Sequence, residues 1–307
     1  MSEHCQWLHE QLQARPVVRF PFDEAGLPEN GIYFFYEDGE MWGHSGRQPR
    51  IVRIGTHRDG NFRSRIADHY LSRGRSMDLH VNKPAPKDRS IFRKHLGRAL
   101  LAKAQDPYLE IWNIDFTTNR NRRAYGNRRN VAEEREIEEQ VTHLLCEKFT
   151  FRYLELDVAV ARMGNKGLEA ALIGTVAGCT LCKPSVSWLG HYSPKPQIRQ
   201  SGLWLVQHLK SRPINGEDKE AIITVLTRPQ GVGGRDSAAS DPTTMFPSRI
   251  ANCPECDSDK IVFPLQPGER GKDVSSGDDW RCSECSCAGS QSGCTVIVTR
   301  VGKRRLS

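Results

Sequence analysis

The sequence predicts a mixed helix-and-strand domain followed by a small cysteine-rich module. Three observations support this prediction. Two segments, residues 30–40 and 50–57, alternate in the manner of β-strands, and several later segments carry the period of amphipathic helices. Six of the ten cysteines lie beyond residue 252. We therefore expect one unit with an apolar core and a second, smaller unit organised by its cysteines.

Composition allows a core beneath a strongly polar surface, since hydrophobic residues make up 37% of the 307 residues and the mean hydropathy is −0.57. No apolar run reaches the roughly 20 residues of a membrane span, and the N-terminus lacks the layout of a signal peptide. We expect a cytoplasmic protein with no membrane partner. The 44 Lys and Arg residues outnumber the 37 Asp and Glu residues, and the net charge of +7 suits a polyanionic partner without identifying it.

The first strand, NGIYFFYEDGE at residues 30–40, divides its side chains between two faces. These are Ile32, Phe34 and Tyr36 on one face, and Tyr33 and Phe35 on the other. We expect the first face to enter the main core and Tyr33 to face away from it. The second strand, RIVRIGTH at residues 50–57, follows a longer loop.

Helical periodicity marks four segments, at residues 61–73, 90–103, 133–149 and 167–178. Ser90 fits the N-cap of the second segment. The third segment is dense in glutamate, which predicts a solvated face, and Glu138 is its best candidate for a metal ligand.

Two polar segments separate these elements. Residues 120–129 crowd five arginines among glycine and asparagine, which fits either a solvated loop or a loop that contacts phosphates. Residues 229–248 are small and polar with no apolar period, which predicts a linker.

The cysteines beyond the linker have the spacing of a structural zinc ribbon. Two Cys-x2-Cys pairs, CPEC and CSEC, supply four ligands: Cys253, Cys256, Cys282 and Cys285. Four cysteine ligands leave no open position on a tetrahedral Zn²⁺ ion, so the ion would be structural. Cys287 is an alternative to Cys285, and Cys294 lies close by. A third pair, Cys179 and Cys182, has no partner pair beside it in the sequence, and we expect it to pack at a helix end.

Polar residues of the first unit form an ordered set. Gly31-Ile32-Tyr33 lies on the first strand and Ile54-Gly55 on the second. Arg65 and His69 stand one helical turn apart, and Glu169 sits in an apolar helix at a cost that suggests a ligand or partial exposure.

This ordered set resembles the GIY-YIG nuclease superfamily over residues 31–204. The residues RIGTH at 53–57 and the segment 184–204 are similar to a bacterial branch with R-x-G-T-H at its second strand. Arg53 departs from the family pattern, because it stands where the second tyrosine is expected. The resemblance implies an α+β fold, with a small antiparallel sheet flanked by helices and a helical insertion.

The resemblance also implies a role for each residue of the set. Glu169 would hold a catalytic Mg²⁺, Arg65 would bind the scissile phosphate, and Tyr33 would be the general base. A cation must favour the phenolate of Tyr33, and Arg53, His57 or His69 could supply it. The expected catalytic set is therefore Tyr33, Arg65, His69, His57 and Glu169.

We thus expect a nuclease domain at residues 1–228 with an insertion at about 73–165, a linker at 229–248 and a zinc ribbon at 249–307. The expected function is Mg²⁺-dependent endonucleolytic cleavage of DNA, with the ribbon aiding DNA binding. Cutting both strands with one site per chain calls for two chains or two events, so a homodimer is one expectation. The rival interpretations are a catalytically inactive zinc-ribbon protein that binds nucleic acid, and an adaptor whose ribbon binds protein.

Overall fold

The structure is a computed structural model of the chain. It describes residues 2–57, 60–71, 77, 79–156 and 167–227, together with the backbone of four short strands at 261–262, 280–282, 288–292 and 295–300. The chain divides into two compact units, residues 1–235 and residues 236–307.

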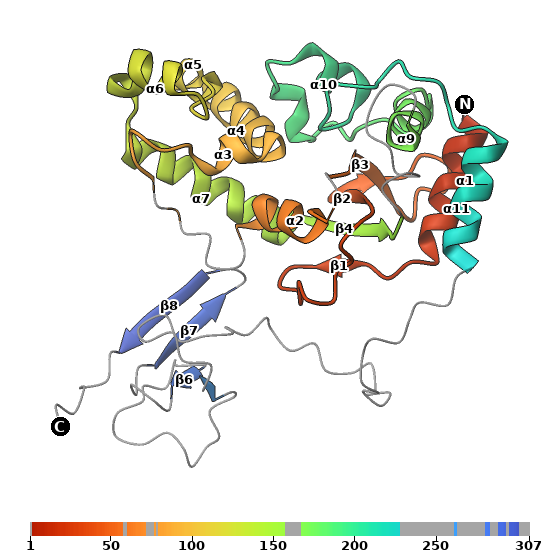
Figure 1. Cartoon of the computed structure of the whole chain (residues 1–307), viewed down its shortest axis with the longest axis horizontal. Helices are drawn as coiled ribbons and strands as arrows, with labels where there is room; N and C mark the ends of the chain where they lie inside the picture. The colour runs from red at the N-terminus through yellow and green to blue at the C-terminus, as the bar shows by residue number, and fades with distance from the viewer. Residues whose placement is uncertain are drawn as a thin grey trace. The chain divides into compact units, whose positions relative to one another are not determined.

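The first unit is built on a four-stranded antiparallel sheet (Figure 1). Its strands in spatial order are β1 (Val18–Arg19), β4 (Phe149–Leu154), β2 (Ile32–Met41) and β3 (Pro49–Gly55). Strand β2 pairs with β4 on one side and with β3 on the other. The two strands predicted from the sequence are β2 and β3. Helices surround the sheet, which confirms the predicted α+β fold.

One face of the sheet forms the main core with three helices, α1 (Ser2–Gln13), α9 (Leu168–Ala177) and α11 (Gly216–Thr227). The side chains that β2 contributes are Ile32, Phe34 and Tyr36, as the strand alternation predicts. Residues from all three helices join this core, and Leu172 of α9 is fully buried in it. The helix predicted at 167–178 is α9.

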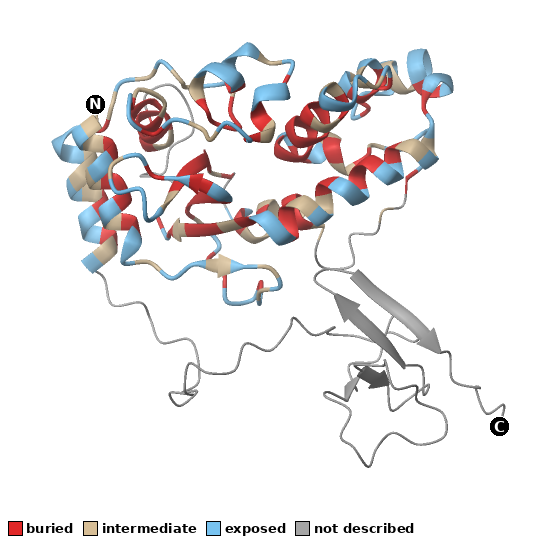
Figure 2. Ribbon diagram, turned by 180° about the vertical axis from the view of Figure 1, so that it is seen from behind, coloured by how far each residue is buried: buried red, intermediate tan, exposed pale blue. Residues whose placement is uncertain are grey.

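The opposite face of the sheet is also buried, beneath α2 (Phe62–Tyr70) and α4 (Ile91–Ala104). Phe35 packs against Phe92 of α4 with ring centroids 5.1 Å apart. Tyr33 packs against Phe62 of α2 at 6.0 Å and is only 1% exposed. Figure 2 shows buried residues concentrated in the sheet, α4 and α9. Tyr33 faces away from the main core, but into a second aromatic core that strand periodicity alone does not reveal.

The helical insertion follows α2. Its elements are α3 (Pro86–Arg89), α4, α5 (Leu109–Asn113), α6 (Asn119–Tyr125), the 3-10 turn η1 (Gly126–Arg128) and α7 (Val131–Lys148). The predicted N-cap is confirmed, because Ser90 Oγ accepts a hydrogen bond from the Arg93 backbone N–H at 3.3 Å. Strand β4 begins directly after α7, so the range 73–165 runs past the helices into the sheet.

Two glutamates of α7 are buried, contrary to the predicted solvated face. Glu138 accepts hydrogen bonds from the Arg93 side chain, and their closest N···O distance is 2.6 Å. Glu134 pairs with Arg129 at 2.5 Å. All four side chains have no exposed surface. Each carboxylate therefore neutralises a buried arginine, and removing either carboxylate would leave a buried charge unpaired.

The arginine-rich segment is ordered as α6 and η1, so the expectation of a loop was wrong. Arg122 folds back onto the backbone and donates to the carbonyl oxygens of Phe116 and Thr117. Arg120 and Arg123 remain exposed on α6.

The segment after α9 is anchored to β2 by two tryptophans. It contains η2 (Leu189–Tyr192) and α10 (Pro196–Ser201). The indole N–H groups of Trp188 and Trp204 both donate to Glu37 Oε2, each at 2.9 Å. One buried carboxylate thus fixes both ends of this segment.

The second unit contains a four-stranded antiparallel sheet in the order β5-β6-β7-β8. The strands are β5 (Ile261–Val262), β6 (Trp280–Cys282), β7 (Ala288–Ser292) and β8 (Thr295–Arg300). The predicted zinc ligands Cys253, Cys256 and Cys285, the alternatives Cys287 and Cys294, and the predicted linker lie outside the described residues, as does the side chain of Cys282.

Candidate functional site

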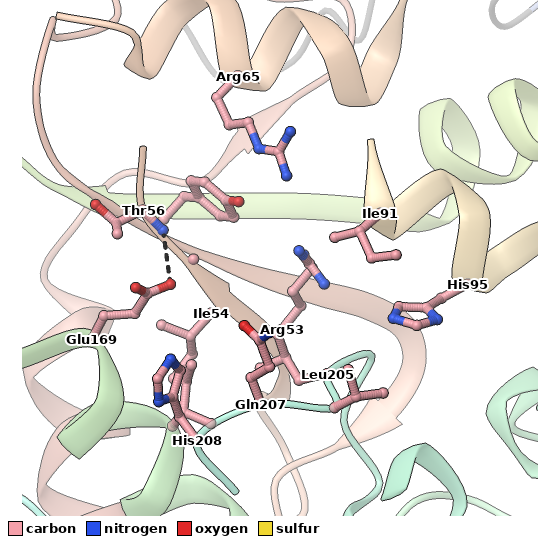
Figure 3. Close-up of a pocket in the computed structure, with 14 residues that line it drawn as sticks. Arg53, Ile54, Thr56, Arg65, Ile91, His95, Glu169, Leu205, Gln207 and His208 are labelled. Carbon is pink, nitrogen blue, oxygen red and sulfur yellow. Dashed lines mark hydrogen bonds between the residues drawn. The ribbon is translucent and has the colours of Figure 1, made fainter. Parts of the chain in front are cut away.

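A cavity of about 570 Å³ opens where β3 ends, and it is lined by residues from six parts of the first unit (Figure 3). Tyr33 comes from β2, Arg53 from β3, Arg65 from α2 and Glu169 from α9. The remaining polar residues include His95 of α4 and His208 of the segment before α11. The sheet and three helices thus bring together residues far apart in the sequence.

Tyr33 reaches the cavity across the glycine of its partner strand. Tyr33 and Gly55 are paired in the β2–β3 register. A Cβ atom at position 55 would lie 2.3 Å from the Tyr33 hydroxyl oxygen and 2.5 Å from the ring carbon that carries it. Only glycine therefore leaves room for the Tyr33 ring at this position.

Behind Tyr33, away from the cavity, lies His69 of α2. Its Nε2 is 3.2 Å from the Tyr33 hydroxyl oxygen, and its Nδ1 is 2.7 Å from Ser90 Oγ. Burial lowers the pKa of His69 well below its usual value, and the charges of Arg65, Arg53 and Arg93 lower it further. His69 is therefore neutral and carries one ring proton.

That proton belongs on Nε2. Ser90 Oγ already accepts the backbone N–H of Arg93, and its own hydroxyl is fully buried and must donate. Within the described part of the chain, His69 Nδ1 is the acceptor at hand, 2.7 Å away. With Nδ1 accepting, Nε2–H donates to the Tyr33 oxygen. The N-cap of α4 thus sets the tautomer of a side chain on α2.

Arg53 is buried with its guanidinium group in the cavity. Its terminal nitrogen Nη1 donates to the carbonyl oxygen of Trp204 at 2.5 Å, and its carbon Cζ lies 4.8 Å from the centre of the Phe92 ring. Burial lowers the pKa of Arg53, and the nearby Tyr33 oxygen and Glu169 oppose this shift. A positive charge therefore stands beside the Tyr33 hydroxyl.

Arg65 and Glu169 occupy different walls of the cavity, and Figure 3 shows Arg53 and Arg65 directing their guanidinium groups toward its middle. Arg65 donates to the carbonyl oxygen of Arg89 at 2.7 Å. Glu169 Oε1 accepts the backbone N–H of Thr56 at 3.2 Å. Burial raises the pKa of Glu169, although His208, Arg53, Thr56 and Arg65 each lower it. Among the lining residues, Glu169 is the only carboxylate.

Two predicted residues lie elsewhere. His57 does not line the cavity: its Nε2 accepts the backbone N–H of Gly31 at 2.8 Å, and its ring packs on Phe62 at 5.4 Å. Glu138, the alternative metal ligand, is held by Arg93 and by the backbone N–H of Lys87 at 2.6 Å. His57 thus anchors the backbone at the start of β2, and Glu138 holds helices of the insertion together.

Two residues that sequence reasoning missed, His95 and His208, line the cavity. His95 stands one helical turn after Ile91, which also lines it, so the spacing on α4 was the available signal. Burial lowers the pKa of His95 to about 2, helped by Arg53 and Arg98. His208 has a left-handed backbone with φ of 60°, and its sequence carries no such signal.

A second group of side chains lies in the same unit. Cys179 and Cys182 meet Cys5 and His44, and their ligand atoms all lie within 4.8 Å of one another. The expectation that this pair only packs at a helix end is therefore corrected, since its partners come from distant parts of the sequence. Three sulfur atoms and one imidazole nitrogen are ligands typical of zinc.

The antiparallel sheet and the helices around it thus bring a tyrosine, two arginines and one glutamate into a single cavity. The chain belongs to the GIY-YIG domain family, which it matches over residues 6–222. Comparisons with curated proteins and with solved structures found no match. Domains of this family are typically metal-dependent nucleases that usually use Mg²⁺ and act on nucleic acid. In the described part of the chain, no helix is long and apolar enough to span a membrane.

Proposed function

We propose that this chain is a Mg²⁺-dependent endonuclease that cleaves DNA in the cavity of the first unit. The observation that carries the proposal is that Tyr33, Arg53, Arg65 and Glu169, from four different elements, line one cavity. Each supplies a property that phosphodiester hydrolysis requires. These are a proton acceptor, two fixed positive charges and a carboxylate for a metal ion.

Glu169 fits a Mg²⁺ site. Its Oε1 is oriented by the Thr56 backbone, and its position in the first turn of α9 fixes its distance from the sheet. A partly buried carboxylate whose pKa is raised by burial is stabilised by a nearby cation. Mg²⁺ keeps several of its waters, so one carboxylate can suffice, and when bound it would neutralise charge on the phosphate.

Arg53 and Arg65 favour a phosphate between them. Arg65 lowers the pKa of Arg53, because the two positive charges repel each other. A phosphodiester oxygen would relieve this repulsion and accept charge-assisted hydrogen bonds. The same two charges oppose the negative charge that increases during hydrolysis.

Tyr33 would accept a proton from the attacking water. A phenol has an ordinary pKa of about 10, so its phenolate must be favoured by its surroundings. Arg53 supplies a positive charge, and the Nε2–H of His69 supplies a hydrogen bond to the same oxygen. His69 is a positioning residue because it acts on the tyrosine and does not line the cavity. No positive charge on His69 is needed.

The second unit would bind one structural zinc ion through Cys253, Cys256, Cys282 and Cys285 and contribute to DNA binding. A four-stranded sheet of short strands fits a ribbon. A homodimer would bring two such active sites to one duplex.

Two conservative substitutions test the catalytic roles. Tyr33→Phe removes only the hydroxyl, and loss of a general base lowers the rate by about 10²–10⁴-fold. Arg65→Lys keeps the charge but loses the planar fork that binds two phosphate oxygens. Both variants should nick supercoiled plasmid far more slowly than the parent while retaining its melting temperature.

Matched controls lie beside each residue. Tyr153→Phe removes a hydroxyl from the strand paired with Tyr33, and Arg63→Lys makes the same exchange on α2; neither residue lines the cavity. Both controls should nick plasmid at the parental rate. Should the parent bind DNA but fail to cut it with Mg²⁺ or Mn²⁺, the chain is instead an inactive binding protein, for which Arg53 in place of a tyrosine is the supporting observation.

A further inference from the structure

We propose that Cys5, His44, Cys179 and Cys182 bind one structural zinc ion inside the nuclease domain, in addition to any ion held by the second unit. The proposal does not depend on the nuclease activity. It rests on the distances between the four ligand atoms, on the groups around them and on the segments that they join.

The distances fit a tetrahedral ion. A zinc ion with Zn–S bonds of about 2.3 Å and a Zn–N bond of about 2.0 Å separates two sulfurs by about 3.8 Å, and a sulfur from a nitrogen by about 3.5 Å. The Cys5 and Cys182 sulfurs are 3.7 Å apart, and His44 Nε2 is 3.2 Å from Cys179 Sγ. None of the three cysteines is in a disulfide. One ion can therefore reach all four ligand atoms with small adjustments.

Three separate segments supply the ligands. Cys5 lies on α1, His44 lies in the loop between β2 and β3, and the Cys-x2-Cys pair follows the end of α9. The hairpin loop is closed by hydrogen bonds from the Trp42 N–H to the Gln48 carbonyl at 2.6 Å and from the Gly46 N–H to the Trp42 carbonyl at 2.7 Å. This closure holds His44 toward the cysteines.

The loop approaches the cysteine pair so closely that a side chain at position 43 is excluded. A Cβ atom on Gly43 would lie 2.0 Å from the carbonyl oxygen of Leu181. Glycine at position 43 therefore allows the loop that carries His44 to pack against the segment that carries Cys182.

His9 completes the surroundings of Cys5. Its Nε2 accepts the backbone N–H of Ile51 at 3.1 Å, so its proton lies on Nδ1 and donates to the Cys5 carbonyl at 2.9 Å. Both ring nitrogens are thus occupied, which assigns the histidine ligand to His44. The His9 ring stacks on Trp42 at 5.1 Å and closes the site on that side.

The four ligands leave no open coordination position, so the ion would be structural. It would link the first helix, the β2–β3 hairpin and the end of α9, whose first turn carries Glu169. Loss of the ion should therefore loosen the segments that hold the main core without removing any residue that lines the cavity.

Metal content of the full chain tests the site. Cys179→Ser should lower the zinc content by about one ion per chain relative to the parent. Cys146→Ser removes a buried thiol on α7, outside the cluster, and should change nothing. Because the measurement is a difference, zinc in the second unit does not affect it. Equal zinc content in the parent and in Cys179→Ser overturns the proposal.

Two further measurements apply if Cys179→Ser does not fold. His44→Ala removes a partly buried ligand, and loss of a ligand should weaken zinc binding by at least the 10–100-fold typical of an outer-shell change, measured by competition with a chelator. X-ray absorption at the zinc edge of the full chain carrying Cys253→Ser and Cys282→Ser should show three sulfurs and one nitrogen. No zinc in that protein, together with a Cys179–Cys182 disulfide by mass spectrometry, would instead identify a redox pair.

Discussion

At the scale of single residues, the close contact between Gly55 and Tyr33 explains why the site requires a glycine at the end of β3. Gly55→Ala places a methyl group 2.3 Å from the tyrosine oxygen, and overpacking of this kind costs about 1–3 kcal/mol. Urea unfolding should show this loss in the parent background. The loss of stability caused by Gly55→Ala should be smaller when Tyr33→Ala is also present, because the clashing atoms are then absent.

Gly216→Ala is the matched control for this double-mutant cycle, because no atom lies within 4 Å of a Cβ at that position. It should leave the free energy of unfolding nearly unchanged. If Gly55→Ala costs as much with Tyr33→Ala as without it, the contact does not explain the glycine.

Sequence patterns placed some of these residues better than others. The resemblance to the GIY-YIG family grouped Tyr33, Arg65 and Glu169, and all three line one cavity of the structure. His57 was expected beside them, but alternation does not reveal that its ring nitrogen accepts the Gly31 N–H. The position of His208 in the cavity depends on its left-handed backbone conformation, which cannot be predicted from a histidine in a loop.

At the scale of the elements, Glu37 connects β2 to the segment that carries Trp188 and Trp204. Burial raises the pKa of Glu37 to about 7, although the two indole donors lower it. The folded chain therefore holds a proton on Glu37 between about pH 4.5, its ordinary pKa, and about pH 7. Stability falls as the pH rises through this range, by up to ~3 kcal/mol.

Glu37→Gln removes this titration while keeping an oxygen that accepts both indole N–H groups. Urea unfolding at pH 5 and at pH 8 should show a smaller loss of stability in the variant than in the parent. Asp38→Asn, an exposed neighbour on the same strand, should behave as the parent does. An identical pH dependence in the parent and in Glu37→Gln would argue against a raised pKa.

Helix α6 presents Arg120 and Arg123 to solvent, whereas Arg122 is turned back onto the backbone. If α6 contacts DNA, replacing both exposed arginines by glutamine should lower the slope of log affinity against log salt by up to about two. Arg212→Gln is the control, since Arg212 pairs with Asp218 at the start of α11. An unchanged slope would make α6 a solvated surface.

The elements themselves were largely predictable, because four helices and two strands have clear periodicity. What the sequence did not reveal is which faces become covered. The sequence gives no sign that α2 and α4 pack on the aromatic face of β2. It also predicts solvated glutamates on α7, whereas Glu134 and Glu138 are paired with the buried Arg129 and Arg93. Cys5 and His44, the partners of Cys179 and Cys182, come from distant segments and could not be predicted from the sequence.

At the scale of the whole molecule, the chain combines a nuclease-family domain with a second unit that we propose to be a zinc ribbon. Cys253→Ser with Cys282→Ser should release the zinc of the second unit and weaken DNA binding, measured by fluorescence anisotropy. The rate at saturating DNA should change little, because the proposed catalytic residues all lie in the first unit. Unchanged affinity would remove the ribbon's role in DNA binding.

The proposed hydrolysis depends most on Glu169 as the ligand of the catalytic metal ion. The measurement that tests it most directly is the initial rate of plasmid nicking as a function of Mg²⁺ concentration, in the parent and in Glu169→Gln. Glu139→Gln, an exposed residue of α7, is the control for the same chemical change. The parent and the control should show Mg²⁺-dependent nicking. In Glu169→Gln the nicking rate should fall by orders of magnitude, while DNA binding in EDTA is retained. Parental nicking by Glu169→Gln would contradict the proposed role of Glu169.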